Sequence, residues 1–167
     1  MTDKTPRIQR LRAELEAAFA NRGDLYRLVL DQLEEALDAE QAESILASAI
    51  EMRGREVART AFARFGAEDA LAIGEAFLDV SPDEGQMYPA DVTRYDNGIE
   101  FKVRRCPLKD SWVNAGLSEE RIATLCRIAG AFDRGLFEET GVRFENWTWQ
   151  PGDGPGCCRI RLLDNPA

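Results

Sequence analysis

The sequence predicts an α+β fold, in which an N-terminal helical layer packs on a mostly antiparallel four-stranded sheet with two helices inserted between the second and third strands. The first half of the chain is rich in alanine and carries apolar residues at helical spacing. After Pro82 the pattern changes to short alternating segments, which are typical of strands. The pair Asn97–Gly98 between two of these segments is a strong hairpin signal. Helices followed by hairpin-forming strands indicate the α+β class.

One domain is expected to span 1–167, because the chain has single-domain length and shows no repeat or low-complexity linker. We expect it to divide into an N-terminal helix within 1–22, a helical layer within 24–81 and a sheet with inserted helices within 87–163. A domain of this size can bury about two-thirds of its unfolded surface.

Four helices are expected in the first half. Apolar residues at helical spacing in 8–19 predict the first helix, and Gly23 is expected to end it. The second helix is expected to begin at Asp24, whose side chain can cap a helix N-terminus. The third and fourth are expected at about 41–65 and 68–78.

Gly54 interrupts the third expected helix between Arg53 and Arg55. A glycine inside a helix costs up to about 1 kcal/mol relative to alanine, so it usually has a packing reason. Close approach of another element is the favoured explanation, and exposure of an arginine to a pocket is the alternative.

The second half is expected to hold four strands and two helices. Ser118, followed by two glutamates, predicts a helix start. The expected elements are strands at 87–95, 99–105, 142–149 and 157–163, a short helix from Pro107 to near Gly116, and a longer helix from Ser118 to about Gly135.

Composition excludes several classes of function. The net charge is −9, from 21 Lys and Arg against 30 Asp and Glu, which disfavours nucleic acid and anionic membranes as partners. No apolar run reaches the length of a membrane span, and the polar start of the chain shows no signal peptide. We therefore expect a cytoplasmic protein whose four cysteines are reduced. The absence of histidine excludes His-based triads, His general bases and every zinc site that contains a histidine.

Cys106 is the strongest candidate for a reactive group. A strand is expected to end at the Cys106–Pro107 junction and a helix to begin there, which places Cys106 at or beside a helix N-cap. A helix N-terminus and nearby cations, here Arg105 and Lys109, both lower the pKa of a thiol. The alternative is a small, half-buried apolar residue, because free cysteine is among the most buried residue types.

Cys126 and Asp133 share one face of the helix expected after Ser118. Their spacing of two turns would separate them by roughly 10 Å along the axis, close enough to line one groove. Asp133 is either a base or substrate anchor, or a boundary residue paired with an arginine such as Arg134.

Strand parity separates the last two cysteines. In a strand starting at Cys157, Cys158 would point inward with Ile160, whereas Cys157 would point outward with Arg159. We therefore expect Cys106, Cys126 and Cys158 to converge and Cys157 to be a dispensable bystander. The three sulfurs could hold zinc or an iron–sulfur cluster, although their spacing matches no known signature of either.

Several of these segments resemble the L-2-amino-thiazoline-4-carboxylic acid hydrolase family. The similarity is carried by 101–108, by Leu125–Cys126 with Asp133, by the 151–160 ending, and by the helix around 53–56. It covers most of the chain from about Tyr26 onward. The resemblance implies hydrolytic opening of a small cyclic amidine or thiazoline ring.

The hydrolase hypothesis assigns roles to particular residues. A thiolate could attack the ring C=N carbon, or a carboxylate could activate water, and a substrate carboxylate would need a cation. The candidate catalytic residues are Cys106, Cys126 and Asp133. The candidate substrate-binding residues are Arg55, Arg105 and Trp147, and the expected partner is a small anionic molecule. Trp147 could wall a pocket with Trp149, or the pair could simply pack.

Two non-enzymatic hypotheses compete with it. The closing Gly…Cys-x-hydrophobic pattern also resembles small-molecule-binding 4-vinyl-reductase domains, in which cysteines can bind metal, and Cys158 matches their terminal cysteine. The second hypothesis is therefore a small-molecule or metal sensor that uses the three converging cysteines. The third is an interaction domain, including a homo-oligomer, whose cysteines are core residues.

Overall fold

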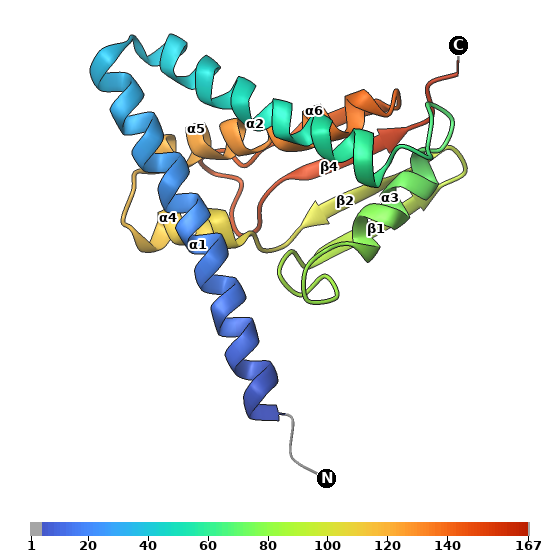
Figure 1. The fold of residues 1–167 in the computed structure, drawn as a ribbon, viewed down its shortest axis with the longest axis horizontal. Coiled ribbons are helices and arrows are strands. Elements are labelled where there is room, and N and C mark those ends of the chain that lie inside the picture. The colour runs from blue at the N-terminus through green and yellow to red at the C-terminus, as the bar shows by residue number, and fades with distance from the viewer. Residues whose placement is uncertain (1–4, 167) are drawn as a thin grey trace.

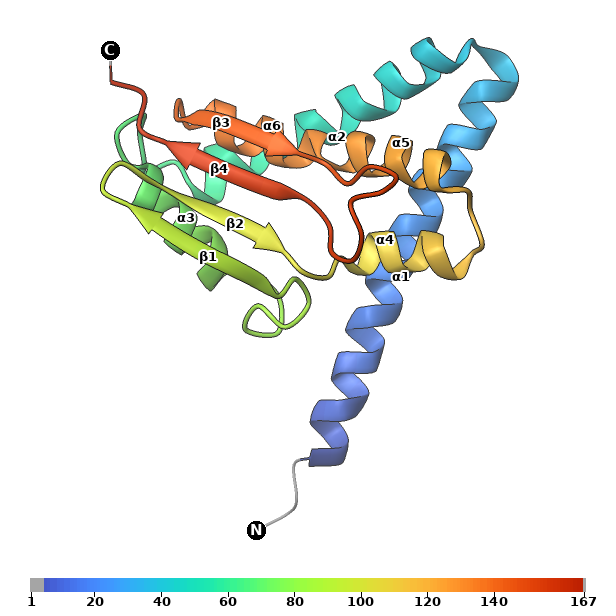
Figure 2. The same ribbon diagram turned by 180° about the vertical axis from the view of Figure 1, so that it is seen from behind.

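The computed structural model describes residues 5–166 and confirms the α+β fold. Helices cover one face of an antiparallel sheet with strand order β1-β2-β4-β3, and the other face is open (Figures 1 and 2). No described helix has the length and apolar character that a membrane crossing needs. The elements are α1 (Thr5–Ala36), α2 (Ala39–Ala61), α3 (Ala70–Asp79), β1 (Ala90–Tyr95), β2 (Gly98–Val103), α4 (Pro107–Asn114), α5 (Glu119–Ala129), α6 (Ala131–Glu139), β3 (Arg143–Trp147) and β4 (Arg159–Leu163).

The first two expected helices form the single helix α1, so the predicted break at Gly23 is wrong. Gly23 is buried where α1 crosses α4 (Figure 1), and a Cβ there would clash with the Ser111 side chain. The Trp112 indole N–H donates to the Gly23 carbonyl at 2.9 Å. Gly23 therefore permits a helix crossing instead of ending a helix. The part of the expected 1–22 helix before Thr5 lies outside the described residues.

The expectation of a close approach at Gly54 is confirmed. A Cβ on Gly54 would clash with the carbonyl oxygen of Phe132 in α6, and a Cβ on Gly135 would clash with the carbonyl oxygen of Glu51 in α2. The two backbones are thus in direct contact along this stretch. The Asp38 side chain caps the start of α2 by accepting from the Gln41 amide at 2.9 Å.

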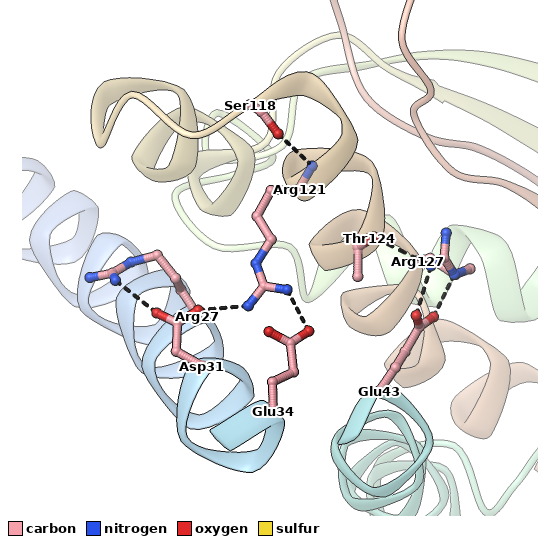
Figure 3. Close-up of polar contacts among 8 residues, drawn as sticks. All are labelled: Arg27, Asp31, Glu34, Glu43, Ser118, Arg121, Thr124 and Arg127. Atoms are coloured by element: carbon pink, nitrogen blue, oxygen red, sulfur yellow. Dashed lines mark hydrogen bonds and ion pairs between the residues drawn. The ribbon is translucent and has the colours of Figure 1, made fainter. Parts of the chain in front are cut away.

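Ion pairs hold α5 against α1 and α2. Figure 3 shows Arg121 of α5 reaching Asp31 at 2.6 Å and Glu34 at 2.7 Å, both on α1. Arg127, one and a half turns further along α5, pairs with Glu43 of α2 in the same view. Charge-assisted arginine–carboxylate pairs of this kind fix geometry as well as adding stability.

The single long helix expected from Ser118 to Gly135 is wrong, because Gly130 divides it into α5 and α6. Ser118 does cap the start of α5, accepting from the Arg121 amide at 3.2 Å. A Cβ on Gly130 would crowd Asn146 and Thr148 of the neighbouring strand region. Cys126 and Asp133 consequently lie on two successive helices.

The hairpin signal is confirmed, with Asp96 and Asn97 as the two turn residues and Gly98 as the first residue of β2. β2 then pairs with β4, where Phe101 lies opposite Ile160. Both side chains are buried beneath the helices, whereas Arg161, which follows Ile160 in β4, points to the opposite face and is half-buried. The observed strands are shorter than expected, since β1 begins only at Ala90 and β4 only at Arg159.

We predict that Gly54→Ala destabilises the protein by about 2–3 kcal/mol, because the new methyl group forces α2 and α6 apart. Chemical denaturation followed by circular dichroism measures the effect. Gly66→Ala is the matched control, since the nearest atom to its Cβ would be 3.9 Å away. There we expect no loss and a gain of up to about 1 kcal/mol from reduced unfolded-state entropy. Equal effects at the two positions would contradict the close-contact interpretation.

Candidate functional site

The four cysteines form one cluster, and Cys157 is at its centre. The Cys157 sulfur lies 3.4 Å from that of Cys158, and the thiols of Cys106 and Cys126 also interact with it and influence its pKa. We call these four residues the thiol cluster. It joins the start of α4, the middle of α5 and the loop that enters β4. The structure brings Cys106, Cys126 and Cys158 together around Cys157.

The prediction that Cys157 faces solvent is wrong, because only 4% of its surface is exposed. Strand parity does not apply to it, since β4 begins two residues later and Gly156, at φ +105°, bends the chain just before it. The Cys157 amide donates to the Val103 carbonyl at 2.9 Å, which anchors the loop beside the end of β2. Cys158 is half-buried.

Cys106 occupies the expected N-cap of α4, with extended backbone and Pro107 in the first helical turn. The amides of Leu108 and Lys109 point at its sulfur and favour the anion. Contact with Cys157 and burial nevertheless outweigh them and raise the pKa of Cys106 well above its ordinary value. The expectation of a low-pKa thiol at Cys106 therefore does not hold.

Cys157 is the group that carries the negative charge of the thiol cluster. Interaction with the Cys106, Cys126 and Cys158 thiols lowers its pKa far below the ordinary thiol value. The same interactions, together with burial, raise the pKa of each of the other three. Cys157 is therefore the thiol of the cluster that loses its proton first.

The Asp133 carboxyl group interacts electrostatically with Cys157. Desolvation by the surrounding protein, followed by the negative charge of Cys157, raises the pKa of Asp133 to about 7, against a smaller opposing effect of Arg22. The residue as a whole is half-buried, while its carboxyl group is the part that the protein desolvates. A carboxyl group with this pKa can donate or accept a proton near neutrality, as histidine does in other proteins.

Lys109 and Trp149, which the sequence offers as a cation near Cys106 and as a possible pocket wall, contact each other beside the thiol cluster. The buried Lys109 ammonium lies 4.3 Å from the centre of the Trp149 ring and donates to the Gly156 carbonyl. The Trp149 indole N–H donates to the Gly154 carbonyl at 3.0 Å. These contacts fix the loop that presents Cys157.

Arg22 and Tyr88 also belong to the site and were missed. Arg22 of α1 donates to the Tyr88 hydroxyl at 3.1 Å. Burial and the nearby Cys106 raise the pKa of Tyr88, while the charge of Arg22 acts on both Tyr88 and Asp133. These residues lie on elements far apart in sequence and carry no local motif, so only the fold could reveal them.

The structure does not bring the three expected substrate-binding side chains to the thiol cluster. Arg55 pairs with Glu51 and Glu139. Arg105, although adjacent to Cys106 in sequence, pairs with Glu16 and Asp110. Trp147 stacks against Arg159 on the open face of the sheet.

The thiol cluster does not have the arrangement of a metal site. Within 5–166, no group of three or more Cys, Asp or Glu side chains is placed to hold a metal ion. The zinc or iron–sulfur hypothesis therefore gains no support from this geometry.

Comparisons with known proteins agree with the architecture. A family model described as L-2-amino-thiazoline-4-carboxylic acid hydrolase matches 16–162 of this chain. No curated protein matches it. Solved structures of similar fold include trafficking protein particle complex subunit 3 from Naegleria fowleri, covalently bound to palmitic acid, at 14% identity and a TM-score of 0.55. That match covers 90% of this chain and 96% of the other, and at this identity it speaks for the fold alone.

We predict that one thiolate persists in the native protein well below the ordinary thiol pKa of about 8.5. Its ultraviolet absorbance should be lost in Cys157→Ser, because the thiol that loses its proton first is then absent. Protein unfolded in urea is the control and should titrate normally. Loss of the signal in Cys106→Ser, with retention in Cys157→Ser, would instead assign the thiolate to Cys106.

Asp133 makes stability depend on pH in a defined direction. Its pKa rises on folding from 3.8 to about 7, so its contribution is fully present below pH 3.8 and is lost as pH rises through 7. We expect Asp133→Asn to stabilise the protein by about 2 kcal/mol at pH 8 relative to its effect at pH 5. Melting temperatures of both proteins across this range measure it. A constant difference between them would show that Asp133 titrates normally.

Proposed function

The chain belongs to the L-2-amino-thiazoline-4-carboxylic acid hydrolase family, and on this basis we propose that it hydrolyses a small thiazoline or cyclic amidine ring at the thiol cluster. The family name indicates a hydrolase that acts on an aminothiazoline carboxylate. The observation that carries the proposal is the pairing of a Cys157 thiolate with Asp133, a carboxyl group whose pKa is about 7. A nucleophile beside a proton donor is what ring opening requires.

The first half of the reaction opens the ring. The Cys157 thiolate attacks the ring carbon of the protonated C=N group and forms a carbon–sulfur bond. The ring sulfur then leaves that carbon and takes the proton of Asp133, so that the departing group is a neutral thiol. The opened substrate stays attached to Cys157 as an isothiourea-type adduct.

The second half releases the product. The Asp133 carboxylate, now ionised, removes a proton from water, and the resulting hydroxide adds to the same carbon. The bond to Cys157 breaks and the sulfur leaves as a thiolate, which Cys106, Cys126 and Cys158 stabilise. One water is consumed, a urea-type carbonyl is formed, and the proton that the ring carried is released.

This assignment moves the nucleophile from Cys106 to Cys157 but keeps Asp133 in the role expected from the sequence. A chain without histidine needs another group that exchanges protons near neutrality, and Asp133 meets that need. The three remaining thiols stabilise the negative charge on the Cys157 sulfur when it leaves, as an oxyanion hole stabilises a negatively charged oxygen.

We expect kcat/KM for L-2-amino-thiazoline-4-carboxylate to fall above pH 7, because Asp133 must be protonated to deliver the first proton. Asp133→Asn should lower kcat about 10²- to 10⁴-fold, with the alkaline decline no longer set by this group. Cys157→Ser should abolish turnover. Release of thiol from the ring, followed with a thiol reagent, measures all three.

The competing hypotheses are tested with the same preparation. Protein purified without chelator is assayed for metal, and stoichiometric zinc or iron with no turnover would favour the sensor. Full activity in Cys157→Ser would remove the thiolate from the mechanism and leave water activated by Asp133.

A further inference from the structure

An arginine without a carboxylate partner is unusual in this acidic protein. Most arginines in 5–166 form an ion pair with a carboxylate, as Arg105 does with Glu16 and Asp110. The arginines that form no such pair with a described carboxylate are Arg7, Arg22, Arg64 and Arg159. Of these, Arg22 is the one whose charge acts on Asp133 and Tyr88 of the site.

Aromatic contacts hold the Arg22 guanidinium in place. Its central carbon lies 4.8 Å from the centre of the Phe19 ring, one turn earlier on α1. The Phe19 ring in turn meets Tyr88 edge to face, with ring centres 5.4 Å apart. Gly23, the next residue, is where α1 crosses α4, the helix that begins at Cys106. Arg22 is therefore positioned by packing, with exposed N–H groups left to donate.

Tyr88 adds a second donor. Its hydroxyl oxygen accepts from Arg22, which leaves the O–H proton available to another acceptor. The raised pKa of Tyr88 keeps that proton in place. A guanidinium and a phenol side by side suit a carboxylate, whose two oxygens accept from both.

The charges of the site match the charges of an aminothiazoline carboxylate. Such a molecule carries an amidinium at one end and a carboxylate at the other. The Cys157 thiolate and Asp133 supply negative charge for the amidinium, and Arg22 supplies positive charge for the carboxylate. Reversing the ligand would set its carboxylate against the thiolate.

We propose that Arg22 and Tyr88 form a carboxylate subsite, in which the Arg22 guanidinium binds the substrate carboxylate and directs the ring carbon toward Cys157. The inference rests on the proposed function for its substrate class, since it assigns two residues of that site to recognition of an anionic group. It replaces Arg55, Arg105 and Trp147 as the source of specificity.

The test compares two substrates that differ only in this group, L-2-amino-thiazoline-4-carboxylate and 2-amino-2-thiazoline. Arg22→Gln should lower kcat/KM for the carboxylate, mainly through KM, about 10- to 100-fold more than kcat/KM for 2-amino-2-thiazoline, whose smaller change reports the effect of Arg22 on Asp133. Arg22→Lys should recover part of the loss, and Tyr88→Phe should show a smaller loss with the same selectivity. Arg64→Gln is the matched control, because Arg64 is also unpaired and also stacks on a phenylalanine, at 4.6 Å.

A binding experiment separates this inference from the proposed reaction. Thiazolidine-4-carboxylate has no C=N bond to open, and its affinity for wild type and for Arg22→Gln can be measured by calorimetry. Arg22-dependent binding without turnover of any thiazoline would overturn the hydrolase and retain the subsite. Absence of binding to wild type, or an equal loss of kcat/KM for both substrates in Arg22→Gln, would overturn the subsite.

Discussion

The contact between the backbones of α2 and α6 is the constraint on which the site depends. Gly54 and Gly135 face the opposite helix, and a side chain on either would collide with a main-chain carbonyl. This contact fixes the position of α6 along its axis and its rotation relative to α2, because two helices in backbone contact have little freedom to slide past each other. Asp133 lies one residue beyond Phe132, whose carbonyl meets Gly54, so the position of the carboxyl group follows directly from that packing.

Local signals were enough to predict much of the fold. The hairpin at Asn97–Gly98 and the N-cap at Cys106 depend on residues adjacent in sequence, so both could be found without tertiary information. Glycine is harder to interpret, because it occurs both where a helix ends and where two helices cross closely. The sequence pattern predicts a helix end at Gly23, where the structure has a helix crossing, and a helix interior at Gly130, where the structure has a boundary between helices.

The site was less predictable than the fold for a related reason. The parity argument for Cys157 assumed a strand, yet Gly156, adjacent to it, is the kind of residue that delays a strand start, and this signal could have corrected the assignment. Arg22 and Tyr88 offer no comparable signal. Their roles arise only because α1 passes over the start of α4, a contact that no periodicity encodes.

Cys157 and Asp133 stabilise each other's protonation states. An ionised Cys157 raises the pKa of Asp133, and a protonated Asp133 spares the thiolate a neighbouring negative charge. Near neutrality the pair therefore holds about one negative charge and one transferable proton, the combination that a thiolate–imidazolium pair supplies in proteins with histidine. Arg22 has no carboxylate partner among the described residues, although the chain carries more carboxylates than cations. If a carboxylate of the protein neutralised Arg22, its guanidinium would no longer be free to bind an anionic ligand, since the Lys109 ammonium is already bound to the Gly156 carbonyl and stacked on Trp149.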